Sequence, residues 1–233
     1  MMIRKMTGLG AAIAILTSGS AAASFIDFED ANVRGLVDND AVTNEYQGTN
    51  SVVFSGGFIE ASGGDDANPQ GFITDQVSSP DVDLSNGTPG LGNWFVRTEG
   101  EIGQRGSGSI FLSIFYDGIV TGASGEIWDI DGNSGQGTEK WNVVALNNGS
   151  EVLSVASPEG FNNGTLSMDG LPWFFELNGA VFDQINFEFA GTKEFGVGLG
   201  FDNFTSSVPE PGTLGLLGLG LLGLGAARRR FSV

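Results

Sequence analysis

Short hydrophobic runs alternate with polar and glycine-rich segments along most of this chain, and that pattern predicts β-strands. The alternation is clearest near residue 187, where Ile185, Phe187 and Phe189 are separated by Asn186 and Glu188. No segment between residues 24 and 207 has the sustained three- and four-residue spacing of an amphipathic helix. We predict about a dozen strands, at residues 25–29, 51–54, 57–60, 72–75, 94–97, 109–116, 126–130, 140–146, 151–156, 173–177, 181–189 and 195–204.

Glycine and asparagine mark the turns between these segments. The sequence Asn147-Asn148-Gly149-Ser150 is typical of a tight hairpin between two strands. Residues 61–71 and 77–93 are predicted loops, and neither has the composition of a domain boundary. Many short strands with closely spaced turns favour an all-β fold, and we predict one jelly-roll-like β-sandwich domain over residues 24–207.

The first 23 residues have the three parts of a secretory signal peptide. Arg4 and Lys5 are followed by an apolar run at residues 9–16 and by three alanines at residues 21–23. Cleavage after Ala23 would begin the mature chain at Ser24, and a buried helix is the alternative interpretation.

The C-terminal segment contains a proline motif, an apolar run at residues 212–227 and a cluster of arginines. As a helix, the run would rise about 24 Å, somewhat less than a hydrocarbon core of about 30 Å. Arginine side chains can extend to the interface and the bilayer can thin, so we predict one transmembrane helix. Arginines directly after the run place that end in the cytoplasm and the preceding domain outside. The motif and cluster are Val208, Pro209, Glu210, Pro211, Arg228, Arg229 and Arg230.

This arrangement resembles the PEP-CTERM sorting signal of exported bacterial proteins. The resemblance implies recognition of Pro209, Glu210 and Pro211 by an exosortase, a transpeptidase-like membrane enzyme that removes the tail. It also implies transient anchoring in the inner membrane, then a place at the cell surface or in an extracellular matrix. A simple membrane anchor with a proline linker is the alternative, and it also places residues 24–207 outside the cytoplasmic membrane.

Composition narrows the chemistry available to the domain. The chain has no cysteine and no histidine, which excludes disulfides, thiolate metal sites and catalytic pairs that need an imidazole base. Its net charge is −18, and residues 24–208 carry 5 basic and 27 acidic side chains, a net charge of −22. Such a surface repels nucleic acid and anionic lipid, and it attracts divalent cations.

The predicted first and last strands carry the candidate metal ligands. Jelly rolls commonly pair their terminal strands, so Asp27 and Glu29 would approach Asp202 and Asn203 and hold a structural Ca²⁺ ion, with Asp30 nearby. A similar arrangement occurs in sugar-binding jelly-roll modules. The alternative is that Asp27 and Glu29 form an ordinary solvated face.

A second group of candidate residues lies around position 130. Asp129, Asp131 and Asn133 resemble the start of an EF-hand loop, but Ser134 and Lys140 occupy positions where that loop has glycine and glutamate. A hairpin turn at Asp131-Gly132, between strands at Trp128 and Trp141, is the favoured interpretation.

The same region offers a ligand-binding hypothesis and an enzymatic one. Trp128 and Trp141 would stack on a sugar ring while Asp129 and Asp131 bind its hydroxyl groups, although each tryptophan is favoured as a core residue. The segment 126–131 also resembles the acidic strand of laminarinase-like glycosidases. Strand periodicity places Glu126 on the face opposite Asp129 and Asp131, which disfavours a hydrolase.

These patterns favour an exported, non-catalytic surface or matrix protein for which polysaccharide is a candidate ligand. The PEP-CTERM resemblance contributes to this hypothesis, since such proteins tend to occur in bacteria that make exopolysaccharide. A secreted glycan-active hydrolase and a structural adhesin that self-associates through edge strands are the alternatives.

Overall fold

The computed structural model describes residues 24–61, 93–98, 107–128, 130, 132–133, 137–160, 172–194, 197 and 200–208. These residues belong to one compact unit, Ala22–Pro209. The predicted signal peptide, residues 62–92 with the predicted strand at 72–75 and most of both predicted loops, and the predicted transmembrane helix lie outside the described residues. No helix in the described part of the chain is long and apolar enough to cross a membrane.

The described secondary structure is almost entirely antiparallel β, which confirms the all-β prediction; one short helix, α1 (Gln47–Asn50), accompanies it. Ten strands form a single sheet in the order β10-β9-β11-β6-β12-β5-β4-β2, with β1 paired to β12 and β3 paired to β6. A separate two-stranded ribbon consists of β7 (Gly132–Asn133) and β8 (Gly137–Thr138). The strands of the main sheet are β1 (Ser24–Ile26), β2 (Ala41–Val42), β3 (Val52–Ser55), β4 (Gly57–Ala61), β5 (Trp94–Thr98), β6 (Ile110–Trp128), β9 (Trp141–Asn147), β10 (Ser150–Ala156), β11 (Trp173–Phe189) and β12 (Gly200–Ser207).

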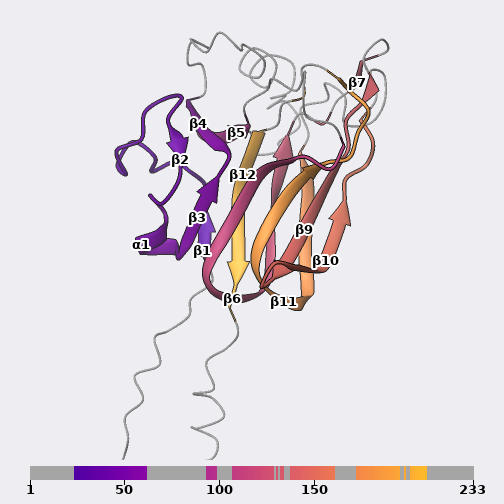
Figure 1. Ribbon diagram of the computed structural model, residues 1–233. Helices are drawn as coiled ribbons and strands as arrows, with labels where there is room; N and C mark the ends of the chain where they lie inside the picture. Colours follow the sequence, from indigo (N-terminus) through magenta and orange to yellow (C-terminus); the bar gives the residue numbers. More distant parts are fainter. Residues whose placement is uncertain are drawn as a thin grey trace, which may run out of the picture. The chain divides into compact units, whose positions relative to one another are not determined.

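Two long strands, β6 and β11, run through both layers of the fold. The first half of β6 pairs with β3, and its second half pairs with β12. The two strands pair with each other along most of their length, with register shifts near Phe182, and Figure 1 shows them curving at the lower end of the domain. We call β3, β6, β11, β9 and β10 the first layer, and β11, β6, β12, β1, β5, β4 and β2 the second layer.

Each of these long strands corresponds to two strands in the sequence-based prediction. Residues 109–116 and 126–130 were predicted as separate strands, yet β6 extends through the intervening residues, and β11 likewise joins 173–177 to 181–189. The intervening segments contain Gly118, Gly122 and Gly179, which are typical of turns but also allow a continuous strand to bend.

Phenylalanine side chains fill the space between the two layers. The ring centroids of Phe175 and Phe187 are 5.4 Å apart although both belong to β11. Twelve residues of straight strand would separate them by about 40 Å, so β11 must fold back over the core. Phe187 also contacts Phe201 and Phe204 of β12, at 4.9 and 6.0 Å between ring centroids. These contacts make the continuous sheet a two-layered structure, as the sandwich prediction requires.

Two predicted connections have different outcomes. The hairpin at Asn147-Asn148-Gly149-Ser150 is confirmed, because β9 and β10 pair through it and Asn148 and Gly149 have φ angles of 50° and 76°. The predicted hairpin between strands at Trp128 and Trp141 is wrong. Trp128 ends β6 and Trp141 begins β9, and β11 lies between these strands in the sheet. Local turn chemistry cannot reveal such an inserted strand.

Candidate functional site

The terminal strands pair as predicted, and they bring two acidic segments to one region. In the β1–β12 ladder, Ser24 lies opposite Ser206 and Ile26 lies opposite Phe204. Asp27 follows β1 directly, and Asp202 and Asn203 lie in β12 at the same end of the ladder. Asn203 has a φ of 54°, at a register shift between β12 and β6.

The side chains around Asp27 have separate structural partners. The Glu29 carboxylate accepts hydrogen bonds from the backbone nitrogen and Nδ2 of Asn93, at 2.6 and 2.9 Å. Asp30 forms an ion pair of 2.8 Å with Arg34, whose guanidinium lowers the pKa of this carboxyl. Asp27 Oδ1 accepts a 3.3 Å hydrogen bond from the backbone nitrogen of Glu29. These contacts organise the loop after β1.

A buried pair of carboxyl groups lies beside this loop. Asp202 and Glu126 are directly opposite each other on β12 and β6, and their side chains are 2% and 8% exposed. Glu126 Oε2 accepts hydrogen bonds from Trp128 Nε1 at 3.1 Å and from Asn203 Nδ2 at 3.0 Å. Burial, followed by the negative charges of Glu126, Asp27 and Glu29, raises the pKa of Asp202 to about 9 against the effect of a backbone hydrogen bond from Asn203.

This geometry bears on the calcium expectation. Among the described residues, no group of three or more acidic side chains is arranged to hold a metal ion. The carboxyl pair with the Asn203 amide supplies only part of the roughly six to eight oxygen ligands that Ca²⁺ takes. Calcium binding by Asp27, Glu29, Asp202 and Asn203 therefore stays a prediction. The involvement of Glu126 was missed because it depends on the register between β6 and β12.

The predicted sugar platform of two tryptophans is wrong. Trp128 is 1% exposed and Trp141 is 0% exposed, so neither ring can stack on a ligand. Trp128 is held by its hydrogen bond to Glu126, and the Trp141 ring packs edge-on against Phe111 and Phe189 at 5.0 and 5.4 Å. In a core without cysteine, these large side chains fill volume. Asp129 and Asp131 lie outside the described residues.

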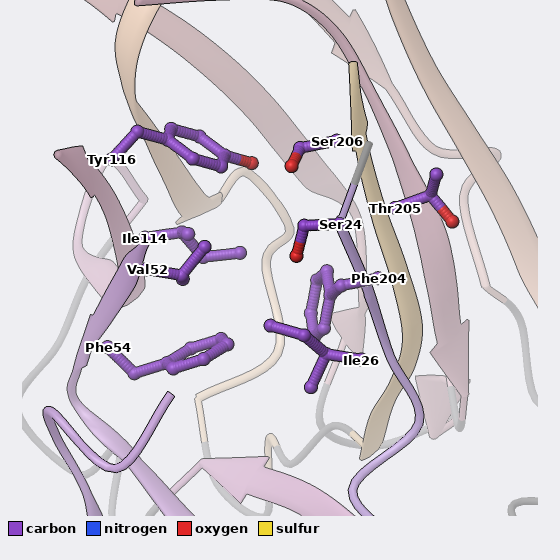
Figure 2. Close-up of a pocket in the computed structure, with 9 residues that line it drawn as sticks. All are labelled: Ser24, Ile26, Val52, Phe54, Ile114, Tyr116, Phe204, Thr205 and Ser206. Carbon is purple, nitrogen blue, oxygen red and sulfur yellow. The ribbon is translucent and has the colours of Figure 1, made fainter. Parts of the chain in front are cut away.

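One pocket lies between the layers, close to where the chain enters and leaves the domain. It has room for roughly one water molecule, which is too little for a sugar ring. Figure 2 shows the Tyr116 hydroxyl pointing toward Ser24 and Ser206, above an apolar floor that includes Phe54 and Ile26. Burial raises the pKa of Tyr116, so its hydroxyl stays protonated. The pocket is a packing feature of the β1–β12 junction.

The outer surface of the first layer carries a ladder of polar side chains. Along β11, Gln184, Asn186 and Glu188 alternate with the buried Ile185 and Phe187. Their cross-strand neighbours in β6 are Phe115, Ser113 and Ile110, and those in β9 are Leu146, Val144 and Asn142. We call these nine residues the Asn186 face.

Hydrogen bonds fix the centre of the Asn186 face. Asn186 Oδ1 accepts from Ser113 Oγ at 2.9 Å and from Gln184 Nε2 at 2.7 Å. With both hydrogen bonds made to Oδ1, the Asn186 Nδ2 group occupies the other position of the amide. Phe115 is 40% exposed at one end of this row, and Ile110 is 46% exposed at the other.

The sorting motif begins where the described domain ends. The strand β12 ends at Ser207, and the partly buried Val208 packs against the core. Residues 207–230 match the PEP-CTERM protein-sorting motif. This match confirms the resemblance for the tail, and it points to an exported protein that is anchored at the membrane before processing. Pro209, Glu210, Pro211 and the three arginines lie within the match and outside the described residues.

Beyond the sorting motif, the chain has only distant similarity to known proteins and solved structures. No curated protein matches the chain. The CBM22-1 xylan-binding domain of Paenibacillus barcinonensis Xyn10C aligns at 9% identity and a TM-score of 0.34, covering 84% of this chain and 99% of that domain. The CBM22-1–GH10 modules of Clostridium thermocellum xylanase 10B, complexed with xylohexaose, align at 11% identity and a TM-score of 0.29, covering 75% of this chain and 28% of that one. TM-scores this low do not establish a common fold, and they assign no ligand to this chain.

Proposed function

We propose that this chain is an exported, non-catalytic protein of the cell surface or extracellular matrix, sorted by its C-terminal tail and processed by an exosortase-type enzyme. The observation that carries the proposal is the PEP-CTERM match at residues 207–230, which starts at the last residue of β12. The leader at residues 1–23 agrees with it, because a secretory signal and a sorting tail belong to the same export route.

The non-catalytic part of the proposal rests on the chemistry that the chain carries. Without histidine or cysteine, acid–base work falls to carboxyl groups. Glu126, the most central acid of the glycosidase-like segment, is 8% exposed and accepts hydrogen bonds from Trp128 and Asn203. A buried carboxyl group with these partners supports a structural role. A hydrolase that uses Asp129 and Asp131 is the alternative.

Polysaccharide is the ligand that we propose, since an acidic domain with exposed polar and aromatic side chains suits a hydroxyl-rich polymer better than nucleic acid. A structural calcium ion near β1 and β12 belongs to the same proposal on sequence grounds. The adhesin alternative has one supporting observation. Among the described strands, β10 lies at an edge of the sheet and pairs only with β9, and an edge strand is a position at which another chain can pair.

The sorting proposal is tested by expressing the full chain, with one tag after residue 23 and a second tag after residue 233, in a bacterium that contains an exosortase. We expect the C-terminal tag to be lost and the domain to leave the membrane fraction. Replacing Pro209, Glu210 and Pro211 together by alanine should keep the tail attached and the protein in the membrane. Glu176→Ala, an exposed acid in β11, is the control and should be processed normally. Equal processing of the triple variant would contradict the proposal.

A further inference from the structure

The Asn186 face offers hydrogen-bonding groups whose orientation is already fixed. Asn186 is only 4% exposed, and both hydrogen bonds that its side chain makes reach Oδ1. Within the described part of the chain, no group accepts a hydrogen bond from Asn186 Nδ2 or donates one to Gln184 Oε1. The buried Asn186 therefore orients Gln184, and the half-buried ladder residues present an amide acceptor at Gln184 and a carboxyl acceptor at Glu188.

Apolar side chains border this polar row. Gln184 lies between Phe115 of β6 and Leu146 of β9, and Phe115 is 40% exposed. A sugar ring has apolar C–H faces and hydroxyl groups at its edges, and each hydroxyl both donates and accepts. Two hydrogen-bond acceptors beside an exposed aromatic ring can bind the hydroxyl groups and one apolar face of such a ring.

Charge limits the kind of sugar polymer that fits. Glu188 and Glu151 lie on the same outer surface, and burial and the negative charge of Glu151 raise the pKa of Glu188. Residues 24–208 carry a net charge of −22, so a polymer with carboxylate or sulfate groups would be repelled. A neutral polymer meets no such penalty and can donate hydroxyl hydrogen bonds to Glu188.

The outer surface of the second layer lacks these properties. There, the cross-strand groups Glu126, Trp128 and Asp202 are all buried. On the Asn186 face, Gln184 and Glu188 are only half-buried on either side of the buried Asn186. Phe174 is 63% exposed on the surface of the second layer, opposite Glu126. It provides an exposed aromatic residue outside the polar row, and hence a matched control for Phe115.

We infer that the Asn186 face binds a neutral polysaccharide, with Gln184 and Glu188 contacting hydroxyl groups and Phe115 stacking on a sugar ring, while the buried Asn186 holds Gln184 in place. This inference rests on the polysaccharide ligand proposed above and assigns it to one surface and one charge class.

The test is affinity electrophoresis of the full chain, purified in detergent, through gels that contain a panel of neutral polysaccharides or the acidic polymer alginate. We expect retardation by at least one neutral polymer and none by alginate. Phe115→Ala and Gln184→Ala should each weaken retardation about tenfold, the loss expected for one stacking or hydrogen-bonding contact. Phe174→Ala should leave it unchanged. Thermal unfolding of each variant shows whether the fold is retained, and a variant that unfolds is replaced by Phe115→Leu or Gln184→Glu.

The possible outcomes separate the two proposals. If the wild-type chain binds a neutral polymer and folded Phe115 and Gln184 variants bind it equally well, the Asn186 face is wrong while the polysaccharide proposal stands. Tighter binding to alginate would overturn the neutral class. If no polysaccharide retards the wild-type chain, the ligand proposal fails together with this inference, and the sorting proposal is unaffected.

Discussion

Asp202 of β12 lies directly opposite Glu126 of β6, and water reaches neither carboxyl group freely. Two negative charges that face each other across a sheet repel, and burial increases the energy of each charge. With the pKa of Asp202 raised to about 9, this group carries a proton at neutral pH, which avoids the repulsion between two facing negative charges. Glu126 keeps the hydrogen bonds from Trp128 and Asn203 that suit a carboxylate.

The first prediction concerns the pH dependence of stability. The unfolded chain releases the Asp202 proton near pH 4, whereas the folded chain keeps it up to about pH 9. The folded state therefore binds more protons over this interval, and the free energy of unfolding should fall as the pH rises from about 4 to 9. The slope from this group is at most about 1.4 kcal/mol per pH unit.

Asp202→Asn removes this dependence. We expect the variant to be more stable than the wild-type protein at pH 8, by roughly 1–3 kcal/mol, and the difference to shrink toward pH 4. Urea unfolding at several pH values measures it. Glu176→Gln, at an exposed position in β11, is the control for the general reduction of negative charge. A stability difference for Asp202→Asn that does not change with pH would show that the group is not protonated in the folded state.

The second prediction concerns calcium. A cation at the β1–β12 junction would have to displace the proton of Asp202, because metal ligands bind in their deprotonated form. If the sequence expectation is right, Ca²⁺ raises the melting temperature at pH 8 and has a smaller effect at pH 5. Chelation by EDTA should reverse the increase. Unchanged melting temperatures with Ca²⁺ and with EDTA at both pH values would remove calcium from the proposal.

The third prediction concerns the core contact that folds β11 over itself. Phe187 is fully buried and touches Phe175, Phe201 and Phe204. Phe187→Ala should lower the free energy of unfolding by about 3–5 kcal/mol, because it removes apolar burial and leaves a cavity. Phe174→Ala, at a position that is 63% exposed in the same strand, should change it by less than about 0.5 kcal/mol. Similar losses in the two variants, measured by urea unfolding, would contradict the assigned layers.

Local chemistry explains which parts of the fold were predictable from sequence. The Asn148-Gly149 turn was predictable because the φ angles of a tight hairpin select those residues. The strand that contains Phe187 was predictable because alternating apolar and polar residues indicate a strand with one buried face. The continuity of β6 was not predictable from sequence, because glycines such as Gly118 and Gly122 are equally common in a turn and in a bent strand.

The candidate sites divide in the same way. The approach of Asp27 to Asp202 followed from the expected pairing of terminal strands, and that pairing is confirmed. The hydrogen-bond partners of these carboxyl groups could not be predicted from sequence. Glu29 accepts a hydrogen bond from Asn93, and Glu126 accepts one from Asn203, and both partners are distant in sequence. The predicted platform of Trp128 and Trp141 failed because residue type alone does not distinguish an exposed aromatic ring from a buried one.

The sequence by itself determined the sorting tail, since that motif is a linear signal read as a short segment, and it determined the β character of the domain through local alternation and turn residues. Only the tertiary structure decided which side chains share a surface. The register between β11 and its neighbours places Gln184 beside Phe115, and the register between β12 and β6 places Asp202 against Glu126. Register depends on contacts between residues far apart in the chain, so a one-residue shift would reverse both faces without changing the local pattern.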